Sequence, residues 1–424
     1  MKSKLLFYLS VLLCCSQLLH SQIWNVVGNS QYSNESTDFA TTVSGSGYIF
    51  TAYVDQSDNN HLKVKYYDGT SWSDLGGTVT DTGNASFPDI KINTFTNEVW
   101  VAYRTDPPTG DPKLMVKSFD GTNWVTEGDD IAYDGKIPDE KIILQFKFNN
   151  GNAYIASIYE ASGVKRTGAI VSNRSGSWAD EVLLSNNLIP HGLEYNEYDR
   201  VLYGTVPNGP GVQRTTVTMK AYNFSNDSWN IPNSNRVGNT SCVGLGAVNN
   251  FSTFIPITFQ DNTNEIYFNN NPIPALNDGS QIDGRSIQFI QKSWLLPTYL
   301  VYVESDGSVF VWEYDESQSS QFDPSAGWTN VLNGTINVGS ETTAVSLAID
   351  KSFGDLYLTY KDGSSITTKL LDPNFQYTRL YVDANATGNN DGSSWADALT
   401  DLQMGINAAE NSTEKSVWVA AGTY

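Results

Sequence analysis

The fold of this chain is decided by one stretch, Leu62-Lys63-Val64-Lys65-Tyr66-Tyr67-Asp68-Gly69-Thr70-Ser71-Trp72. Apolar and polar residues alternate over its first four positions, which is the pattern of a half-buried β-strand. Asp68-Gly69 then predicts a hairpin turn, because glycine accepts the positive φ that such turns require. The stretch recurs 52 residues later as Leu114-Met115-Val116-Lys117-Ser118-Phe119-Asp120-Gly121-Thr122-Asn123-Trp124. The chain is therefore predicted to consist of repeated copies of one unit.

The tryptophan that ends this stretch recurs at a nearly constant spacing. The successive intervals are 48, 52, 54 and 51 residues, followed by one of 99 that corresponds to two periods. The tryptophans concerned are Trp24, Trp72, Trp124, Trp178, Trp229 and Trp328. A large ring at a fixed place in most copies predicts core packing between neighbouring copies.

Each copy is predicted to contain four short strands in a meander, which is the composition of a β-propeller blade. Segments 90–103 and 347–360 align without a gap and supply the first two strands of their copies. The copies span approximately 38–77, 87–129, 141–182, 189–233, 241–278, 285–333 and 341–374. We expect an all-β, seven-bladed propeller; six blades are the alternative, because segment 241–278 is degenerate and lacks the tryptophan.

The two ends of the repeat region have defects that complement each other. The last copy stops after 366–371 and has no tryptophan strand, whereas 23–28 is a tryptophan strand with no copy in front of it. We predict that 23–28 pairs beside 366–371 and closes the ring. Closure of this kind leaves no open sheet edge.

Residues 1–21 have the pattern of a secretory signal peptide. Lys2 and Lys4 precede the apolar run 5–13, and the small residue Ser21 stands before Gln22. We therefore expect an exported protein, secreted or at the cell surface, with its propeller at 22–374. Cys242 is then the only cysteine of the mature chain, which excludes an intramolecular disulfide.

The charge of the chain argues against some partners. The formal net charge is −21 at pH 7, so the protein repels phosphate backbones and we expect no nucleic-acid partner. After residue 21 no apolar stretch approaches the roughly 20 residues of a membrane-spanning helix.

The pattern changes after residue 374. Residues 380–383 form a predicted strand, Thr400 and Gln403 have the spacing of a helix capping box, and 416–424 predicts a strand followed by a turn. We interpret 375–424 as the truncated strand–helix–strand opening of a further domain, because about 45 residues offer too little core to fold alone. The chain is thus expected to be a fragment of a longer protein.

Both parts resemble known families. The repeat, with its Ala-Tyr strand, its Val-Lys strand and its Asp-Gly-Thr-x-Trp ending, resembles the β-propeller repeats of secreted bacterial surface proteins. The tail, from Leu380-Tyr381-Val382-Asp383 through Leu402-Gln403 to Val417-Trp418-Val419-Ala420-Ala421-Gly422-Thr423-Tyr424, resembles the N-terminal cap of right-handed parallel β-helix domains. Such domains include adhesin-like surface proteins and polysaccharide lyases, and the resemblance implies that any catalytic coils would lie further downstream.

Catalytic motifs are sparse. His61 and His191 are the only histidines that remain after signal cleavage, and neither has a nucleophile motif nearby. The eight arginines are spread thinly, so the carboxylate-binding arginine set of a sialidase is not expected. No catalytic residue is predicted, although two of the many carboxylates could still form a glycosidase pair.

Ligand and metal sites are open at this stage. A transition-metal site is not expected from two histidines and one cysteine. A structural calcium ion could be held by acids within 383–391 or 55–58, with solvated loop acids as the alternative. Trp294 lies outside the tryptophan period and is the one candidate ligand-binding aromatic, with burial under a neighbouring loop as the alternative.

Three functions remain for comparison with the structure. The first is a non-catalytic exported surface protein whose propeller binds an extracellular glycan or a surface protein, or acts as a spacer. The second is an accessory module of a carbohydrate-active enzyme, a lyase or glycosidase, whose catalytic β-helix lies downstream. The third is a propeller that is itself the enzyme, which would require acids and aromatics converging at one mouth of the ring.

Overall fold

The protein is seen in a computed structural model that describes residues 23–80, 82–128, 137–146, 151–161, 298–314, 345–350 and 355–372, and the shorter strands and stretches given below. The larger compact unit spans Val26–Leu371, and a smaller one contains Met1–Asn25 and Asp372–Tyr424. The predicted signal, 1–21, lies outside the described residues. In the described part, no helix is both long enough and apolar enough to span a membrane.

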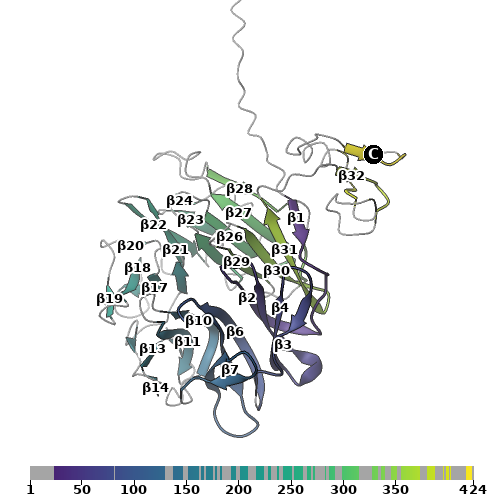
Figure 1. Cartoon of the computed structure of the whole chain (residues 1–424). Helices are drawn as coiled ribbons and strands as arrows, with labels where there is room; N and C mark the ends of the chain where they lie inside the picture. Colours follow the sequence, from purple (N-terminus) through teal and green to yellow (C-terminus); the bar gives the residue numbers. More distant parts are fainter. Residues whose placement is uncertain are drawn as a thin grey trace, which may run out of the picture. The chain divides into compact units, whose positions relative to one another are not determined.

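Antiparallel sheets follow one another along the larger unit (Figure 1). The first sheet contains β2 (Ser36–Val43), β3 (Ile49–Asp55), β4 (His61–Tyr67) and β5 (Trp72–Asp74), and the second contains β6 (Asn84–Asn93), β7 (Glu98–Asp106), β8 (Lys113–Phe119) and β9 (Trp124–Thr126). In each of them the strands pair in chain order, as a meander.

Four further sheets have the same order, two of them with short additional strands. The third sheet contains β10 (Ile137–Phe146), β11 (Ala153–Ala161), β13 (Ala169–Arg174) and β14 (Ser177–Trp178), with β12 (Val164–Arg166) and β15 (Val182–Leu183) beside them. The fourth sheet contains β16 (Gly192–Asn196), β17 (Val201–Asn208), β18 (Thr216–Asn223) and β19 (Ser228–Asn230), with β20 (Arg236–Val237) beside them. The fifth sheet contains β21 (Cys242–Asn250), β22 (Thr253–Gln260), β23 (Glu265–Phe268) and β24 (Asn271–Pro272), and the sixth contains β25 (Gln288–Gln291), β26 (Thr298–Val303), β27 (Val309–Tyr314) and β28 (Trp328–Asn330). The all-β class and the four-stranded units predicted from the repeat are confirmed.

The closing sheet combines the two ends of the repeat region. Its order is β29 (Val345–Ile349), β30 (Leu356–Asp362), β31 (Ser365–Asp372) and β1 (Ile23–Val26). The contact continues past β1, because the amide of Val27 donates to the carbonyl of Thr368 (2.9 Å) and the amide of Tyr32 to that of Ile366 (3.1 Å). This is the pairing that the complementary defects predict.

The Asp-Gly turns form for the reason that the sequence indicates. Gly69 and Gly121 have φ of +93° and +98°, a region that side chains disfavour. One carboxylate oxygen of Asp68 accepts hydrogen bonds from the amides of Thr70 and Ser71, both at 2.8 Å. The turn is therefore held by a local side-chain cap as well as by glycine.

Innermost strands of neighbouring sheets are joined by bonds from a side chain to the backbone. Gln288 of β25 accepts from the amide of Leu347 of β29 (2.9 Å), and Ser346 of β29 accepts from that of Thr41 of β2 (3.0 Å). The series continues where Asp89 of β6 accepts from an amide of β10 (2.7 Å). β6 lies beside β2, and β16 lies beside both β10 and β21, which in turn lies beside β25. The innermost strands thus follow one another in a closed order.

Three tryptophans of the period link their sheet to the preceding tryptophan strand. Trp72 donates its indole N–H to the carbonyl of Val27 (2.8 Å), Trp124 to that of Leu75 (3.0 Å), and Trp178 to that of Glu127 (2.9 Å). Each acceptor lies three positions after the preceding tryptophan of the period.

Burial of these tryptophans is less uniform than core packing predicts. Trp24 and Trp328 are buried, whereas Trp72, Trp124 and Trp178 are half-buried. All five of these tryptophans lie in the outermost strand of their sheets, so the position in the sheet does not account for the difference in burial. The side chain of Trp229 lies outside the described residues.

The smaller unit contains a parallel strand pair. β32 (Leu380–Val382) pairs in parallel with β33 (Val417–Val419), and Val382 also forms a parallel bridge with Leu399. The sequence predicts strands at these two places. The predicted helix after Thr400 falls outside the described residues except for Leu402.

Candidate functional site

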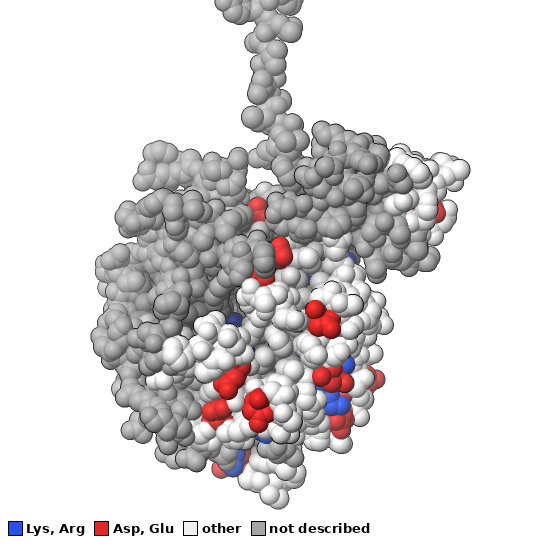
Figure 2. Space-filling model, viewed as in Figure 1, with Lys and Arg blue, Asp and Glu red and all other residues white. Residues whose placement is uncertain are grey.

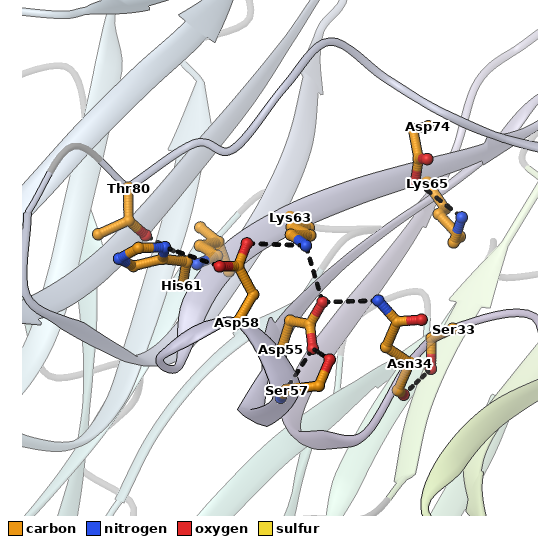
Figure 3. Close-up of polar contacts among 11 residues, drawn as sticks. Ser33, Asn34, Asp55, Ser57, Asp58, His61, Lys63, Lys65, Asp74 and Thr80 are labelled. Carbon is orange, nitrogen blue, oxygen red and sulfur yellow. Dashed lines mark hydrogen bonds and ion pairs between the residues drawn. The ribbon is translucent and has the colours of Figure 1, made fainter.

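A cluster of charged side chains lies where β3 ends and β4 begins (Figure 3). A short 3-10 turn, η1 (Gln56–Asp58), connects the two strands, and Asp55 caps it by accepting from the amide (3.0 Å) and hydroxyl (2.6 Å) of Ser57. Asn59 and Asn60 then have positive φ, which reverses the chain tightly. The reversal brings Asp58 back beside the first residues of β4.

Asp55 is the buried base of the cluster. Its side chain is fully buried, and its second oxygen accepts from Lys63 Nζ and from Asn34 Nδ2, both at 2.8 Å. Burial on its own raises the pKa of Asp55, but the hydrogen bonds from Lys63, Ser57 and Asn34 outweigh it, so the pKa lies below the ordinary value. The Asp55 carboxylate is therefore ionised, and both of its oxygens accept hydrogen bonds.

Lys63 lies between two carboxylates. Its ammonium is 2.8 Å from Asp55 and 2.9 Å from Asp58. Burial on its own lowers the pKa of Lys63, whereas hydrogen bonds to the two carboxylates outweigh burial and hold it above the ordinary value. The lowered pKa of Asp55 and the raised pKa of Lys63 keep both side chains charged at neutral pH.

Asp58 and His61 form the open side of the cluster. The Nδ1 atom of His61 is 3.6 Å from a carboxylate oxygen of Asp58, and the side chains of His61 and Asp58 are 25% and 38% exposed respectively. We call Asn34, Asp55, Asp58, His61 and Lys63 the seam cluster. It offers solvent a carboxylate and an imidazole above a buried, charge-balanced base.

Strand alternation determines which way the cluster faces. Leu62 and Val64 of β4 are buried in the core shared with the second sheet. His61 and Lys63 therefore lie on the opposite face of β4, toward the closing sheet. Asn34 comes from the linker after β1, whose neighbour Ser33 bonds to Ser365 of β31. The cluster thus lies at the seam, the interface between the first sheet and the closing sheet.

The buried pair of the cluster, Asp55 and Lys63, is suited to hydrogen bonding rather than to proton transfer. A general acid or base is most effective with a pKa near the working pH. The pKa values of Asp55 and Lys63 are moved away from neutrality, in opposite directions. Such fixed charges suit the binding of hydroxyl groups, because charge-assisted hydrogen bonds are short and strong.

In one of the two candidate calcium loops, residues 55–58, the acidic side chains contact a lysine. Asp55 and Asp58 do converge, but on the ammonium of Lys63, which supplies the positive charge that a calcium ion would bring. Among the described residues, no group of three or more His, Cys, Asp or Glu side chains is placed to hold a metal. In the other loop, Asp383 accepts from the amide of Asn385 (2.9 Å), and 387–394 lie outside the described residues.

Other sequence candidates are placed only in part. Trp294 and His191 lie outside the described residues, and so does the side chain of Cys242. Arg104 pairs with Asp106 at 2.7 Å. The sequence does not single out Lys63 or Asn34, because a lysine in an alternating strand is typical of a solvent-facing residue. The signal available was the acidic pair at 55 and 58 close to a lysine on the next strand.

Comparisons with known proteins indicate the fold. No protein-family model matches the sequence, and comparison with curated proteins found no relative. The BP39L lectin from Burkholderia pseudomallei has a similar structure, with a TM-score of 0.54 and 13% identity over 80% of this chain and 99% of the lectin. The larger unit therefore has a β-propeller fold.

Two other lectins are similar at lower TM-scores. A mutant of the Aleuria aurantia lectin in complex with Fucα1-6GlcNAc has a TM-score of 0.40 and 12% identity over 73% of this chain and 98% of the lectin. The SapL1 lectin in complex with alpha methyl fucoside has a TM-score of 0.43 and 11% identity over 81% of this chain and 94% of the lectin.

Proposed function

We propose that this chain is a non-catalytic carbohydrate-binding module of an exported protein, built as a seven-bladed propeller over 22–374. The closed order of innermost strands and the sheet that combines both ends of the repeat region support seven blades. The fold shared with the BP39L lectin supports sugar binding. The signal pattern of 1–21 supports export, to the medium or the cell surface.

The seam cluster is the observation that carries this function. Its base is rigid, because Asp55 accepts four hydrogen bonds from three partner residues in the fully buried site. Asp58 and His61 stand above it, accessible to a ligand. A preorganised acceptor next to an imidazole can bind adjacent sugar hydroxyls without losing side-chain entropy on binding.

The charge of the site favours a neutral glycan. Two carboxylates face one ammonium in the cluster. Acidic side chains are also spread over the described face of the protein, with few basic ones between them (Figure 2). Uronic or sialic acids would meet repulsion from these groups, at close range and from the net charge of −21.

An accessory role beside a catalytic domain is the second candidate. The parallel pairing of β32 with β33, and the parallel bridge to Leu399, support the opening of a β-helix at 375–424. In that case the propeller would hold a polysaccharide near a downstream active site. An adhesin-like surface protein would use the same binding site without an enzyme.

The test is a glycan panel with two matched variants. The chain from residue 22 onward is applied to neutral and acidic glycans, and affinities of the glycans that bind are measured by calorimetry. Asp58→Asn removes the exposed charge of the seam cluster. Asp106→Asn is the control, because Asp106 has a similar exposure and a similar ion pair on the second sheet.

We expect neutral glycans to bind and Asp58→Asn to weaken binding about tenfold or more. A hydrogen bond to a charged group contributes about 1.5–3 kcal/mol, and tenfold corresponds to about 1.4 kcal/mol. Asp106→Asn should bind like the unmodified protein. Binding to no glycan, or equal binding by the two variants, would contradict the proposal. Release of reducing ends during the assay would instead identify the propeller as an enzyme.

A further inference from the structure

Five buried hydroxyl groups form a closed ring of hydrogen bonds at the seam. The successive oxygen–oxygen distances are 3.2, 3.2, 2.9, 2.8 and 2.8 Å, in the order Tyr32, Thr51, Thr41, Thr359, Thr368 and back to Tyr32. Each of the five residues is more than nine-tenths buried. The hydroxyl ring joins the linker after β1, two strands of the first sheet and two strands of the closing sheet.

The ring matches donors to acceptors. A hydroxyl carries one hydrogen, so five hydroxyls in a closed ring can each donate once and accept once. Bonds arranged in series polarise one another and strengthen the whole set. Losing one member leaves its two neighbours unmatched in a buried place, where an unpaired polar group is unfavourable.

The neighbouring interface shows that hydroxyls are not needed for packing. In the first sheet, Thr41 of β2 pairs with Thr51 of β3. The equivalent pair in the second sheet is Ile90 of β6 with Val101 of β7. In the closing sheet Thr359 faces Thr368, and in the first sheet the same position is the pair Ala52 and Val64. These four aliphatic residues lie in one buried cluster between the first and second sheets.

The interface between the second sheet and the sheet of β10 and β11 has the same aliphatic pattern. The equivalent pairs there are Ala102 with Val116 and Leu144 with Ile155, and all four are buried together. Among the interfaces whose side chains the structure describes at these positions, only the seam carries hydroxyls on both faces. The seam faces are therefore complementary to each other and not to the aliphatic faces.

We propose that the hydroxyl ring is a pairing device that selects the first sheet and the closing sheet as partners and sets the register of the linker between them. A seam face docked on an aliphatic face would bury threonine hydroxyls without partners. A slipped linker would move Tyr32 away from Thr368 and open the ring. Correct closure is the arrangement that satisfies all five groups.

The experiment replaces the ring by apolar groups of similar shape. The full variant combines Tyr32→Phe with Thr41→Val, Thr51→Val, Thr359→Val and Thr368→Val. The control is Thr42→Val, on the same strand as Thr41 but outside the ring. Light scattering after gel filtration measures the mass, thermal melting measures stability, and hydrogen exchange of the Val27 amide reports on closure.

We expect the full variant to fold, as the aliphatic interfaces do, but to lose a single mode of closure. It should form oligomers or exchange the Val27 amide at least about tenfold faster, because a slipped or open seam is no longer disfavoured. A monomer with unchanged exchange would show that the ring is ordinary packing. Failure of the full variant to fold would also overturn the proposal, because it makes the hydroxyls necessary for stability itself.

A second comparison uses single substitutions. Thr41→Val and Thr359→Val should each lower the melting temperature by about 3 °C or more, since each leaves buried groups unmatched. The double variant should lose less than the sum, because these two hydroxyls bond to each other. Additive losses would contradict a cooperative ring.

Discussion

At the scale of single residues, a glycine accompanies each tryptophan contact. Gly28, Gly76 and Gly128 follow the carbonyls that accept the indole bonds, and all three have positive φ. A side chain at Gly76 would lie 2.8 Å from the ring of Phe119 and 3.1 Å from the indole of Trp124. The glycine therefore permits both the backbone conformation and the close approach of the next sheet.

Replacing Gly76 by alanine should destabilise the protein more than the same change at Gly121. Both positions have positive φ, which costs about 1–2 kcal/mol for a residue with a side chain. Gly121 has open space around it, whereas Gly76 is in close contact, and overpacking adds about 1–3 kcal/mol. Urea unfolding gives both free energies of unfolding. Equal losses would show that the close contact relaxes freely.

At the scale of elements, the linker between β1 and β2 extends the closure. Gln31 donates its amide to the hydroxyl of Thr367 (2.8 Å), and the amide of Ser36 donates to the carbonyl of Ser364 (2.8 Å). The ring of Tyr32 stacks on Trp72 with centroids 3.7 Å apart and planes 6° apart. The linker thus packs against β31 on one side and the first sheet on the other.

Tyr32 should make this closure sensitive to alkali. Burial raises its pKa from 10.0 to about 12, and bonds to Thr368 and Thr51 only partly oppose burial. Because the folded pKa is the higher one, the stabilisation is complete below pH 10 and is lost as the pH rises from 10 to 12. The loss attributable to Tyr32 is about 2–3 kcal/mol above pH 12, of which about half is reached at pH 11.

The measurement is urea unfolding at pH 8 and pH 11, with Tyr32→Phe for comparison. Other buried tyrosines, such as Tyr53 and Tyr360, also have raised pKa values, so the wild type alone does not isolate Tyr32. The variant should lose less stability than the wild type between the two pH values. An identical loss would show that Tyr32 does not titrate as its burial implies.

At the scale of the whole molecule, the fold was more predictable than the site. The tryptophan period and the complementary defects at the two ends of the repeat region predict the pairing of β1 with β31 from the sequence alone. The seam cluster was not predictable, because Asn34 and Lys63 reach Asp55 only after two strands and a linker have paired. In the sequence, Asp55 and Asp58 therefore resemble the ligands of a calcium loop. The position of the Lys63 ammonium between them could not be predicted.

The hydroxyl ring was hidden for the same reason. Thr41, Thr51, Thr359 and Thr368 are ordinary strand residues in the sequence, and their shared position emerges only from the register of two sheets. The half-burial of Trp72 and Trp124 likewise does not follow from the period, because Trp328 has the same strand position in its sheet and is buried. Periodicity predicts which residues recur, but the partners across an interface depend on three-dimensional packing.

Closure of the ring by the N-terminal strand is the central claim, since the seam cluster and the hydroxyl ring both depend on it. Hydrogen exchange of residues 24–36, resolved at the amides of Val27, Tyr32 and Ser36, tests it most directly. These amides donate to carbonyls of β31 or of the turn before it. We predict exchange slowed about 10³-fold or more, comparable to the amides of β7 and β8. Exchange at the rate of an unstructured chain, while β7 and β8 stay protected, would contradict closure.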